Sequence, residues 1–405
     1  NDRVQTAVLN SLAGYNIQNI KQFPYIPYMA LWVDEAALRA LYKVKGVTAV
    51  TEDQVSTPHT SSSSLIIRSD SANSLGYRGQ GQTVAVLDTG VQRLHPDLSG
   101  KVVSEACYST TSAGSGSLSL CPNGGSSQTG SGAANPPPNF VSGYDHGTHV
   151  AGIVAGVAPQ ASIIAIQVFS RYADVAGAPP SSLTPCANSG RPSPCTFSYS
   201  SDQILGLQRV YALRNSYNIA AVNMSLGGGS YTSNCDNLNA ALTTTILSLR
   251  SAGIPTVISA GNNGYRGSIG APACISYAVS VGATTSTPGP MTPNLVGSYS
   301  NAATIMTMFA PGGLIQSAVP TWATNCGPGV APIGNRCFKQ GTSMAAPHVA
   351  GALAVMRSAA PSATVNQMIS AFTSTGPIIT DGRPGGFVSK RRLDVYAATR
   401  QLVGC

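Results

Sequence analysis

The order of apolar and polar positions beyond residue 60 predicts a layered α/β domain. Short segments that are apolar throughout alternate there with segments whose apolar residues recur at helical spacing. The expected strands are 83–87, 162–169, 220–224, 255–259 and 278–281, and the expected helices are 147–155, 201–214, 237–251 and 343–359. Fully apolar strands belong to a sheet that is covered on both sides. We therefore expect a doubly wound, mainly parallel sheet with helices on both faces.

Residues 1–59 follow a different pattern. Helical periodicity over 3–13 and 34–42 alternates with strand-like runs at 28–33 and 47–51, which predicts a small α+β unit. The stretch 56–65 is polar and rich in serine, as is typical of an exposed linker that proteases can reach. We therefore expect two domains, 1–59 and 60–405.

The nine cysteines predict an oxidising compartment. Six of them lie in three long polar stretches, at about 107–140, 170–199 and 314–338, and no Cys-x-x-Cys motif occurs. Pairing nearest neighbours gives Cys107–Cys121, Cys186–Cys195, Cys235–Cys274 and Cys326–Cys337, and leaves Cys405 odd. The sequence does not fix this connectivity, and reduced, buried cysteines are the alternative.

Composition narrows the function classes. Only 9% of the residues are charged, far below the usual quarter, and Ser, Thr, Gly, Asn and Ala supply the surface instead. The net charge of +8 lies entirely in residues 60–405, because residues 1–59 contain as many acidic as basic residues. Lys and Arg are scattered and not interleaved with aromatics, so we expect no nucleic-acid partner. No apolar run is long enough to predict a membrane span.

Four polar residues stand where strand ends and helix starts are expected. Asp88 closes an apolar strand, and Asn262 follows another, where its amide can donate to an oxyanion. His146 and Ser343 begin helical segments, and the helix N-terminus at Ser343 favours developing negative charge. Pro347 is expected in the first turn, where its missing N–H is tolerated. Singly these residues are more typical of caps and turns, but strand ends of a parallel sheet meet at one edge, where sites form.

Two other kinds of site fit the same residues less well. A helical zinc motif needs histidines at i and i+4 with a neighbouring glutamate, whereas His146 and His149 are three apart, so we expect no metal there. An α/β-hydrolase would show Gly-x-Ser-x-Gly and the order Ser, Asp, His. Here Ala345 replaces the second glycine, and the serine comes last.

Five strings, in this order along the chain, resemble the subtilisin-like serine peptidases of the subtilase family. They are 84–90, 146–152, 223–228, 260–262 and 341–348. The resemblance implies that Ser343 attacks the scissile carbonyl, His146 is the base and Asp88 orients the imidazole. It also implies an oxyanion hole made by Asn262 and the Ser343 backbone N–H, with His149 structural.

The same resemblance implies a substrate-binding edge. Its residues are Ser225, Leu226, Gly227, Ala260, Gly261 and Gly270. The segment 225–227 would pair with the substrate backbone, and Gly270 would form the base of the S1 pocket. No acidic residue occurs in these strings, so we expect broad specificity with an apolar or aromatic P1 side chain.

Residues 1–59 resemble the inhibitor propeptide of the same family, most clearly over 47–53, but without its first strand. The resemblance implies an N-terminally truncated propeptide that acts as an intramolecular inhibitor, and a maturation bond near His59–Thr60. Before release, 56–59 would lie in the active-site cleft. The chain is thus expected to be a trimmed product of a self-inhibited zymogen.

The expected function is that of a secreted serine endopeptidase, extracellular or periplasmic and monomeric, which hydrolyses polypeptides through an acyl-enzyme. No cofactor is expected for catalysis. Asp97 matches a calcium ligand of the family, but the family's main calcium loop has no counterpart in 151–159, so structural calcium is possible and not predicted. Two alternatives stay open, namely an inactive binding protein that kept the fold and a latent protein whose propeptide never leaves.

Overall fold

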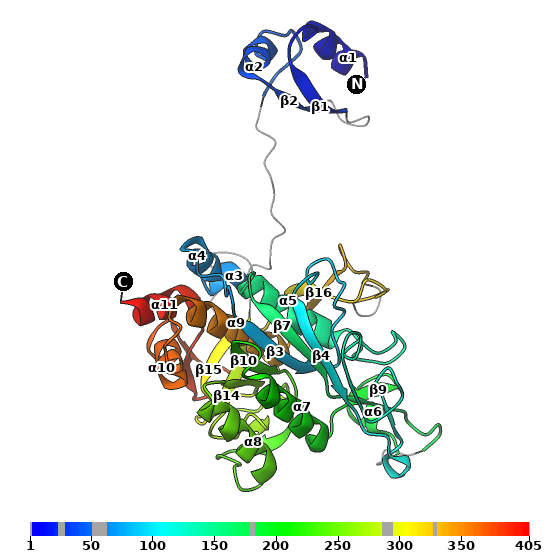
Figure 1. The fold of residues 1–405 in the computed structure, drawn as a ribbon, viewed down its shortest axis with the longest axis vertical. Helices are drawn as coiled ribbons and strands as arrows, with labels where there is room; N and C mark the ends of the chain where they lie inside the picture. Colours follow the sequence, from blue (N-terminus) through cyan, green and yellow to red (C-terminus); the bar gives the residue numbers. More distant parts are fainter. Residues whose placement is uncertain are drawn as a thin grey trace. The chain divides into compact units, whose positions relative to one another are not determined.

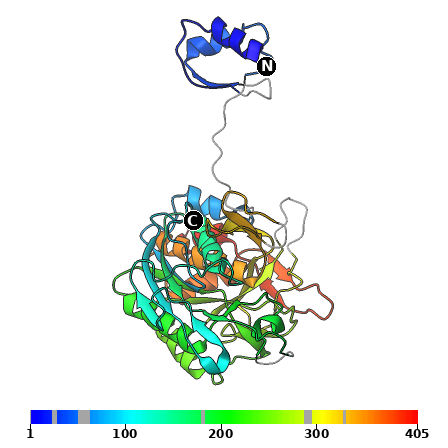
Figure 2. The same cartoon turned by 90° about the vertical axis from the view of Figure 1, so that its right-hand side faces the viewer.

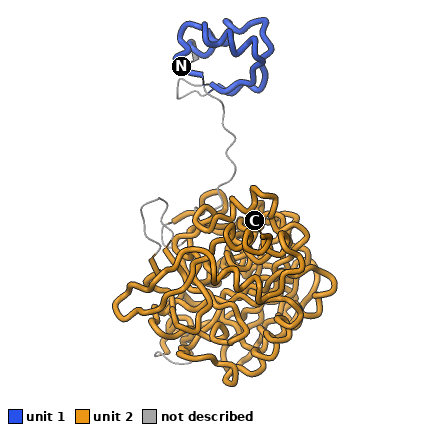
Figure 3. The backbone as a smooth tube through the Cα atoms, turned by 90° about the vertical axis from the view of Figure 1, so that its left-hand side faces the viewer, with its two compact units in different colours: residues 1–59 blue, residues 60–405 orange. Residues whose placement is uncertain are grey.

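A computed structural model describes residues 2–22, 29–50, 63–178, 183–285, 295–326 and 330–404. The chain divides into two compact units, Asn1–His59 and Thr60–Cys405, each of which is described here by itself (Figure 3). The expected maturation bond between His59 and Thr60 lies outside the described residues, as does Cys405. No helix in the described ranges is both long and apolar enough to cross a bilayer.

An eight-stranded sheet forms the centre of the larger unit (Figure 1). Its strands, in spatial order, are β15 Met308–Pro311, β14 Val279–Thr284, β12 Thr256–Ser259, β10 Ile219–Met224, β3 Thr83–Asp88, β7 Ser162–Gln167, β4 Val102–Tyr108 and β6 Ser127–Thr129. All neighbours pair in parallel except β6, which runs antiparallel to β4 at one edge. The predicted α/β fold with a mainly parallel sheet is confirmed, although β4 and β15 had no strand signal of their own.

Helices cover both faces of this sheet (Figures 1 and 2). One layer contains α5 His146–Val157 and α9 Thr342–Ala359, and the other contains α7 Ser200–Leu213 and α8 Ala240–Ser251. Alternate residues of β3 point to opposite layers, so Val84 and Val86 join the core under α5 and α9, while Ala85 and Leu87 join the core under α7 and α8. This double burial explains why most residues of the central strands are apolar.

Shorter elements surround the sheet. They are α3 Ser63–Ile66, α4 Ser69–Ser74, η1 Ala113–Ser115, β5 Ser117–Ser119, β8 Ser170–Tyr172, α6 Pro185–Asn188, β9 Cys195–Phe197, β11 Gly228–Tyr231, β13 Ile269–Ala271, β16 Ile315–Ala318, β17 Arg336–Lys339, α10 Val365–Ser374, β18 Ile378–Thr380, β19 Ser389–Arg391 and α11 Val395–Val403. Strands β5, β8 and β9 form a small sheet, and the pairs β11–β13, β16–β17 and β18–β19 form two-stranded ones. The polar stretches of the sequence are therefore partly ordered as strands.

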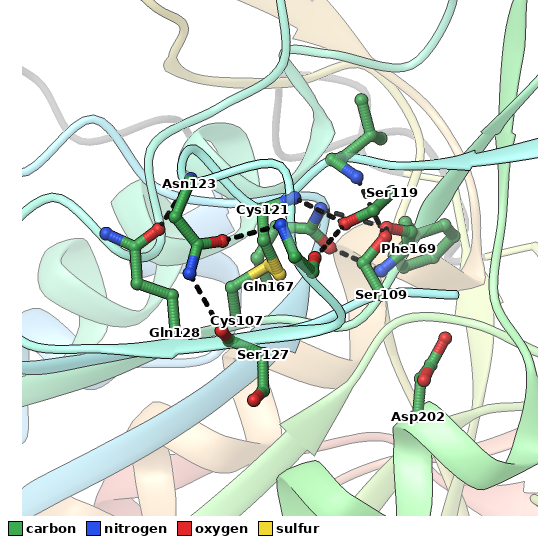
Figure 4. Close-up of a disulfide and its surroundings, with 12 residues drawn as sticks. Cys107, Ser109, Ser119, Cys121, Asn123, Ser127, Gln128, Gln167, Phe169 and Asp202 are labelled. Carbon is green, nitrogen blue, oxygen red and sulfur yellow. Dashed lines mark hydrogen bonds between the residues drawn. A yellow bond between two sulfur atoms is a disulfide. The ribbon is translucent and has the colours of Figure 1, made fainter. Parts of the chain in front are cut away.

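Four disulfides tie these peripheral segments down. They join Cys107 to Cys121, Cys186 to Cys195, Cys235 to Cys274 and Cys326 to Cys337. Around Cys107–Cys121 the loop is held by uncharged side chains (Figure 4): the Ser109 hydroxyl donates to the Phe169 carbonyl at 2.8 Å, and the Asn123 amide donates to the Ser127 carbonyl at 3.0 Å. Bonds of this kind account for an ordered surface with so few charges.

The smaller unit packs α1 Asp2–Ser11 and α2 Glu35–Leu41 with a hairpin of β1 Ile17–Gln22 and β2 Met29–Val33. Strand β1 was not predicted, because five of its six residues are exposed and give no apolar pattern. A strand was expected at 47–51, but the described part, 47–50, is not a strand. Val47 and Val50 instead pack against the small core formed by Val8, Leu12 and Leu41.

Candidate active site

The register of the central sheet brings two of the candidate segments together. Strands β3 and β10 are parallel neighbours, with Leu87 opposite Met224. The next residues, Asp88 and Ser225, therefore stand side by side at the carboxyl edge, where neighbouring strands are about 4.8 Å apart. This edge is where open parallel sheets form their sites.

Asp88 and His146 form a hydrogen-bonded pair. The imidazole Nδ1 donates to the Asp88 Oδ1 at 2.7 Å, and the same oxygen accepts the Thr89 backbone N–H at 2.7 Å. The Asp88 side chain is fully buried, whereas the His146 side chain is 25% exposed, which leaves the imidazole open to a ligand. Gly147 makes the approach possible, because a Cβ there would lie 2.3 Å from the Gly90 carbonyl oxygen.

Ser343 is the second residue of α9 and is held by the residue that follows β10. Its hydroxyl donates to the Ser225 carbonyl at 3.3 Å, and the Ser225 hydroxyl donates to the Ser343 carbonyl at 2.8 Å. Pro347 was expected in the first turn of the helix, and this prediction is wrong. Pro347 is the sixth residue of α9 and lies in its interior. Since Pro347 has no N–H for the Ser343 carbonyl, the Ser225 hydroxyl satisfies that oxygen instead.

Asn262 is fixed at the end of β12, the other neighbour of β10. Its Oδ1 accepts the Thr342 backbone N–H at 2.8 Å and the Thr342 hydroxyl at 3.0 Å. The Asn262 amide group and the Ser343 backbone nitrogen both lie beside Gly341, where a Cβ would be 3.4 Å from Asn262 Nδ2, 3.5 Å from Asn262 Oδ1 and 3.6 Å from the Ser343 nitrogen. Gly341 has a φ of +150°, a conformation that favours glycine.

Sequence reasoning missed two residues that fix this geometry. Thr342 orients the Asn262 amide, and the Asn223 amide donates to the Ser225 hydroxyl at 3.0 Å. Both side chains are fully buried. A polar residue that lies within an apolar strand, as Asn223 does, is the signal that could have identified one of them.

The expected substrate-binding residues come together at the same edge. Ser225, Leu226 and Gly227 continue β10, while Ala260 and Gly261 continue β12. Strand β13 joins the two segments, because Gly270 donates to the Ala260 carbonyl at 2.9 Å and Ala271 pairs with Gly228. Gly227 is exposed, and its φ of +155° places it close to the Ala271 carbonyl.

His149 and His348 lie near this site but are buried within the core. His149 Nε2 donates to the carbonyls of Ile315 and Cys337 at 3.1 and 3.0 Å, and burial lowers its pKa well below the usual value. His348 Nδ1 donates to the Met344 carbonyl at 2.7 Å, and burial lowers its pKa to about 4. Both imidazoles are therefore neutral and structural at physiological pH.

Asp97, the residue matched to a calcium ligand, faces a cation of the protein itself. Both of its carboxylate oxygens accept from Arg336, at 2.8 and 2.7 Å. Burial acts to raise the pKa of Asp97, but the guanidinium outweighs it and holds that pKa below the ordinary value. Among the described residues, no group of three potential metal-binding side chains occurs.

Comparisons with known proteins identify the family of the chain. Residues 79–390 match the family described as the Subtilase family. Subtilisin E of Bacillus subtilis is 31% identical over 395 residues, which cover 94% of this chain and 82% of that protein. The extracellular serine proteinase of a Thermus species is 31% identical over 299 residues, covering 72% and 54% of the two chains.

Solved structures give the same picture of the fold. A protease structure from Pseudoalteromonas arctica superimposes with a TM-score of 0.57 at 25% identity, covering 80% of this chain and 91% of that one. A cold-adapted subtilisin-like serine proteinase superimposes with a TM-score of 0.51 at 24% identity, covering 78% and 89%. The second likeness concerns the fold alone.

Proposed function

The chain belongs to the subtilase family and is a subtilisin-like serine protease that acts on polypeptides, and from that premise we propose that Asp88, His146 and Ser343 are its catalytic triad. The observation that carries the proposal is the adjacency of two strand ends. Asp88, which holds His146, stands next to Ser225, which holds Ser343. The base and the nucleophile are thus each fixed to one of two neighbouring strands.

The chemistry follows from these contacts. The Ser343 hydroxyl turns from the Ser225 carbonyl to His146, gives its proton to the imidazole and attacks the scissile carbonyl. Asp88 fixes the imidazole tautomer, because it accepts the Nδ1–H and leaves Nε2 free to take the proton. The imidazolium then protonates the leaving amine, and water hydrolyses the acyl-enzyme by the same route in reverse.

The oxyanion that forms during attack has two candidate donors. They are Asn262 Nδ2 and the Ser343 backbone N–H, and the proposal is supported by their both lying within 3.6 Å of the Cβ position of Gly341. Their positions are set before substrate binds, because Thr342 holds the Asn262 carbonyl oxygen from behind. Losing one preorganised donor of this kind typically costs about 100- to 1,000-fold in kcat.

The proposed substrate groove runs along the ends of β10 and β12. The substrate backbone would pair as an added strand with Ser225 to Gly227. Ala260, Gly261 and Gly270 would line the S1 pocket. None of the six residues is charged, so we expect broad specificity with an apolar or aromatic P1 side chain. A peptide library that returned a strict requirement for Arg or Lys at P1 would overturn this part of the proposal.

Residues 1–59 are proposed to be an inhibitory propeptide, N-terminally truncated, that is released near His59–Thr60. The enzyme is proposed to be secreted and monomeric. The four disulfides support secretion, because such bonds persist in oxidising compartments.

The Asp97–Arg336 pair supports the proposal that no calcium is needed, because the guanidinium already neutralises that carboxylate. A melting temperature that falls steeply in chelator would contradict it.

One experiment tests the proposed mechanism. The full chain and its Ser343→Ala and Asn262→Ala variants are incubated with a chromogenic peptide amide of apolar P1, while chain length is followed over time. We expect Ser343→Ala to abolish turnover and Asn262→Ala to lower kcat about 100- to 1,000-fold. We also expect loss of about 6 kDa from the N-terminus in the wild type alone. Labelling of the wild type by a fluorophosphonate probe reports an active serine independently of substrate choice.

A further inference from the structure

The hairpin of β16 and β17 is fastened to the helix that begins with His146. The Ser317 hydroxyl donates to the His149 carbonyl at 2.8 Å, and the His149 imidazole donates back to carbonyls of both strands. Gly152 allows the close contact, since a Cβ there would lie 2.3 Å from the Ser317 hydroxyl oxygen. One side of α5 is therefore bonded to the hairpin over its first two turns.

The last residue of the hairpin reaches the start of that helix. Lys339 Nζ lies 2.8 Å from the Asp145 Oδ2, and the two side chains are 23% and 9% exposed. Asp145 immediately precedes His146 and makes no side-chain bond to the helix N-terminus. Within the described ranges, Lys339 is the one cationic side chain within 4.0 Å of this carboxylate.

Lys339 is also close to the proposed nucleophile, Ser343, along the chain. Strand β17 ends at Lys339, and α9 begins at Thr342, with Gly341 held to the Gly312 carbonyl between them at 2.8 Å. Lys339 thus stands four residues before Ser343, while its partner stands one residue before His146. The ion pair is a short bridge between the segments that carry the proposed base and the proposed nucleophile.

We propose that Lys339 is a positioning residue for the proteolytic reaction, acting through Asp145 to hold the His146 segment against the Ser343 segment. This inference rests on the proposed triad. The hairpin supplies the scaffold, and the ion pair fixes both the distance between the two segments and the net charge beside the imidazole. Lys339 does not touch substrate in this role.

The charge near the His146 imidazole depends on the Lys339–Asp145 pair. The ionisable groups around His146 are Asp88 from β3, Asp145 and His149 from its own segment, Lys339 from β17, Arg191, whose charge interacts with Asp88, and Tyr144, which interacts with Asp145. While Lys339 is present, the Asp145 charge is compensated. Without Lys339, the nearly buried Asp145 carboxylate, one residue before His146, loses this cationic partner, and its uncompensated charge favours a positive charge on the imidazole. The variant is then expected to need a higher pH for activity.

The test is a pH profile of kcat/KM for the full chain and five variants, with rates normalised to fluorophosphonate-titrated active sites. We expect Lys339→Met to lower kcat about tenfold and to move the acidic limb upward by about 0.5 to 1 pH unit. Asp145→Asn should move the limb downward, and the double variant Lys339→Met/Asp145→Asn should return it. Lys339→Arg should restore the wild-type limb. Lys390→Met is the matched control, since Lys390 donates to the Thr304 carbonyl and pairs with no carboxylate in the described residues.

The outcomes separate the two proposals. If the wild type is not labelled by fluorophosphonate, the proposed triad fails. If it is labelled but the limb stays in place in Lys339→Met, Asp145→Asn and the double variant, the positioning role is wrong and the ion pair is only structural. If Lys339→Met does not fold, Asp145→Asn and the double variant carry the test, because opposite limb shifts that cancel are required in any case.

Discussion

The two units of this chain differ in how they are held together. The larger unit buries apolar side chains on both faces of an eight-stranded sheet and carries all four disulfides. The smaller unit has one core cluster with three buried members, Val8, Leu12 and Leu41, and a two-stranded sheet whose Trp32 is 51% exposed. A two-stranded sheet and a core of that size are marginal in water. The larger unit therefore has the means to be stable by itself, whereas the core of the smaller unit is expected to make it marginal by itself.

The largest expected effect is loss of the smaller fold on separation. A peptide of residues 1–59 should show the circular dichroism of a largely unfolded chain, because its core cannot offset the conformational entropy of ordering it. Adding it to a 60–405 protein that carries Ser343→Ala should restore helical signal if the proposed propeptide role is correct. A cooperatively folded, isolated peptide would break the comparison and weaken the proposed propeptide role.

How far the sequence predicts each unit follows from the same contrast. Strands such as 83–87 were identified because double burial makes most of their residues apolar, and the same pattern placed Asp88, His146 and Ser343 at strand ends or helix starts. The exposed strand Ile17–Gln22 has no such pattern, and tertiary packing alone decides its state.

The candidate site shows a similar limit. Its residue types can be read from the strings, but its long-range bonds cannot. The contacts of Ser225 with Ser343, Thr342 with Asn262, and Lys339 with Asp145 join residues that are 80 or more positions apart. Nothing local in the sequence marks such pairs, because each depends on which strands become neighbours. The interior position of Pro347 did not depend on such a contact, because the predicted helix 343–359 starts only one residue after α9 and already places Pro347 fifth.

A second, smaller effect concerns the disulfides of the larger unit. Replacing both Cys235 and Cys274 by serine opens a 39-residue loop and should cost about 4 kcal/mol of unfolding free energy. The matched pair Cys186 and Cys195 closes only nine residues and should cost about 2.5 kcal/mol. Denaturant melts in a Ser343→Ala background, which prevents self-digestion, measure both values. The chain-entropy account predicts this order, and the reverse order would show that local packing at each bridge dominates.

The smallest expected effect is a dependence on acid that belongs to the larger unit alone. His348 donates to the Met344 carbonyl and accepts from the Ser63 hydroxyl, so protonation in the folded state removes the second bond as well as charging a buried ring. Burial lowers its pKa from 6.5 to about 4. The unfolded chain therefore binds the proton first as pH falls, and stability declines between about pH 6.5 and 4, by at most about 3 kcal/mol from this residue.

Urea melts of Ser343→Ala and of Ser343→Ala/His348→Gln across that pH range isolate the contribution of His348 to the free energy of unfolding. Asp97 and Asp381, whose pKa values are lowered by Arg partners, do not interfere, because they lose their stabilising effect only below their usual pKa of 3.8. His95 and His149, which are also buried with lowered pKa values, remain in both proteins and cancel in the difference. We expect the free energy of unfolding of the first protein to fall more steeply with acid. Parallel curves for the two proteins would mean that His348 can be protonated without disturbing α9.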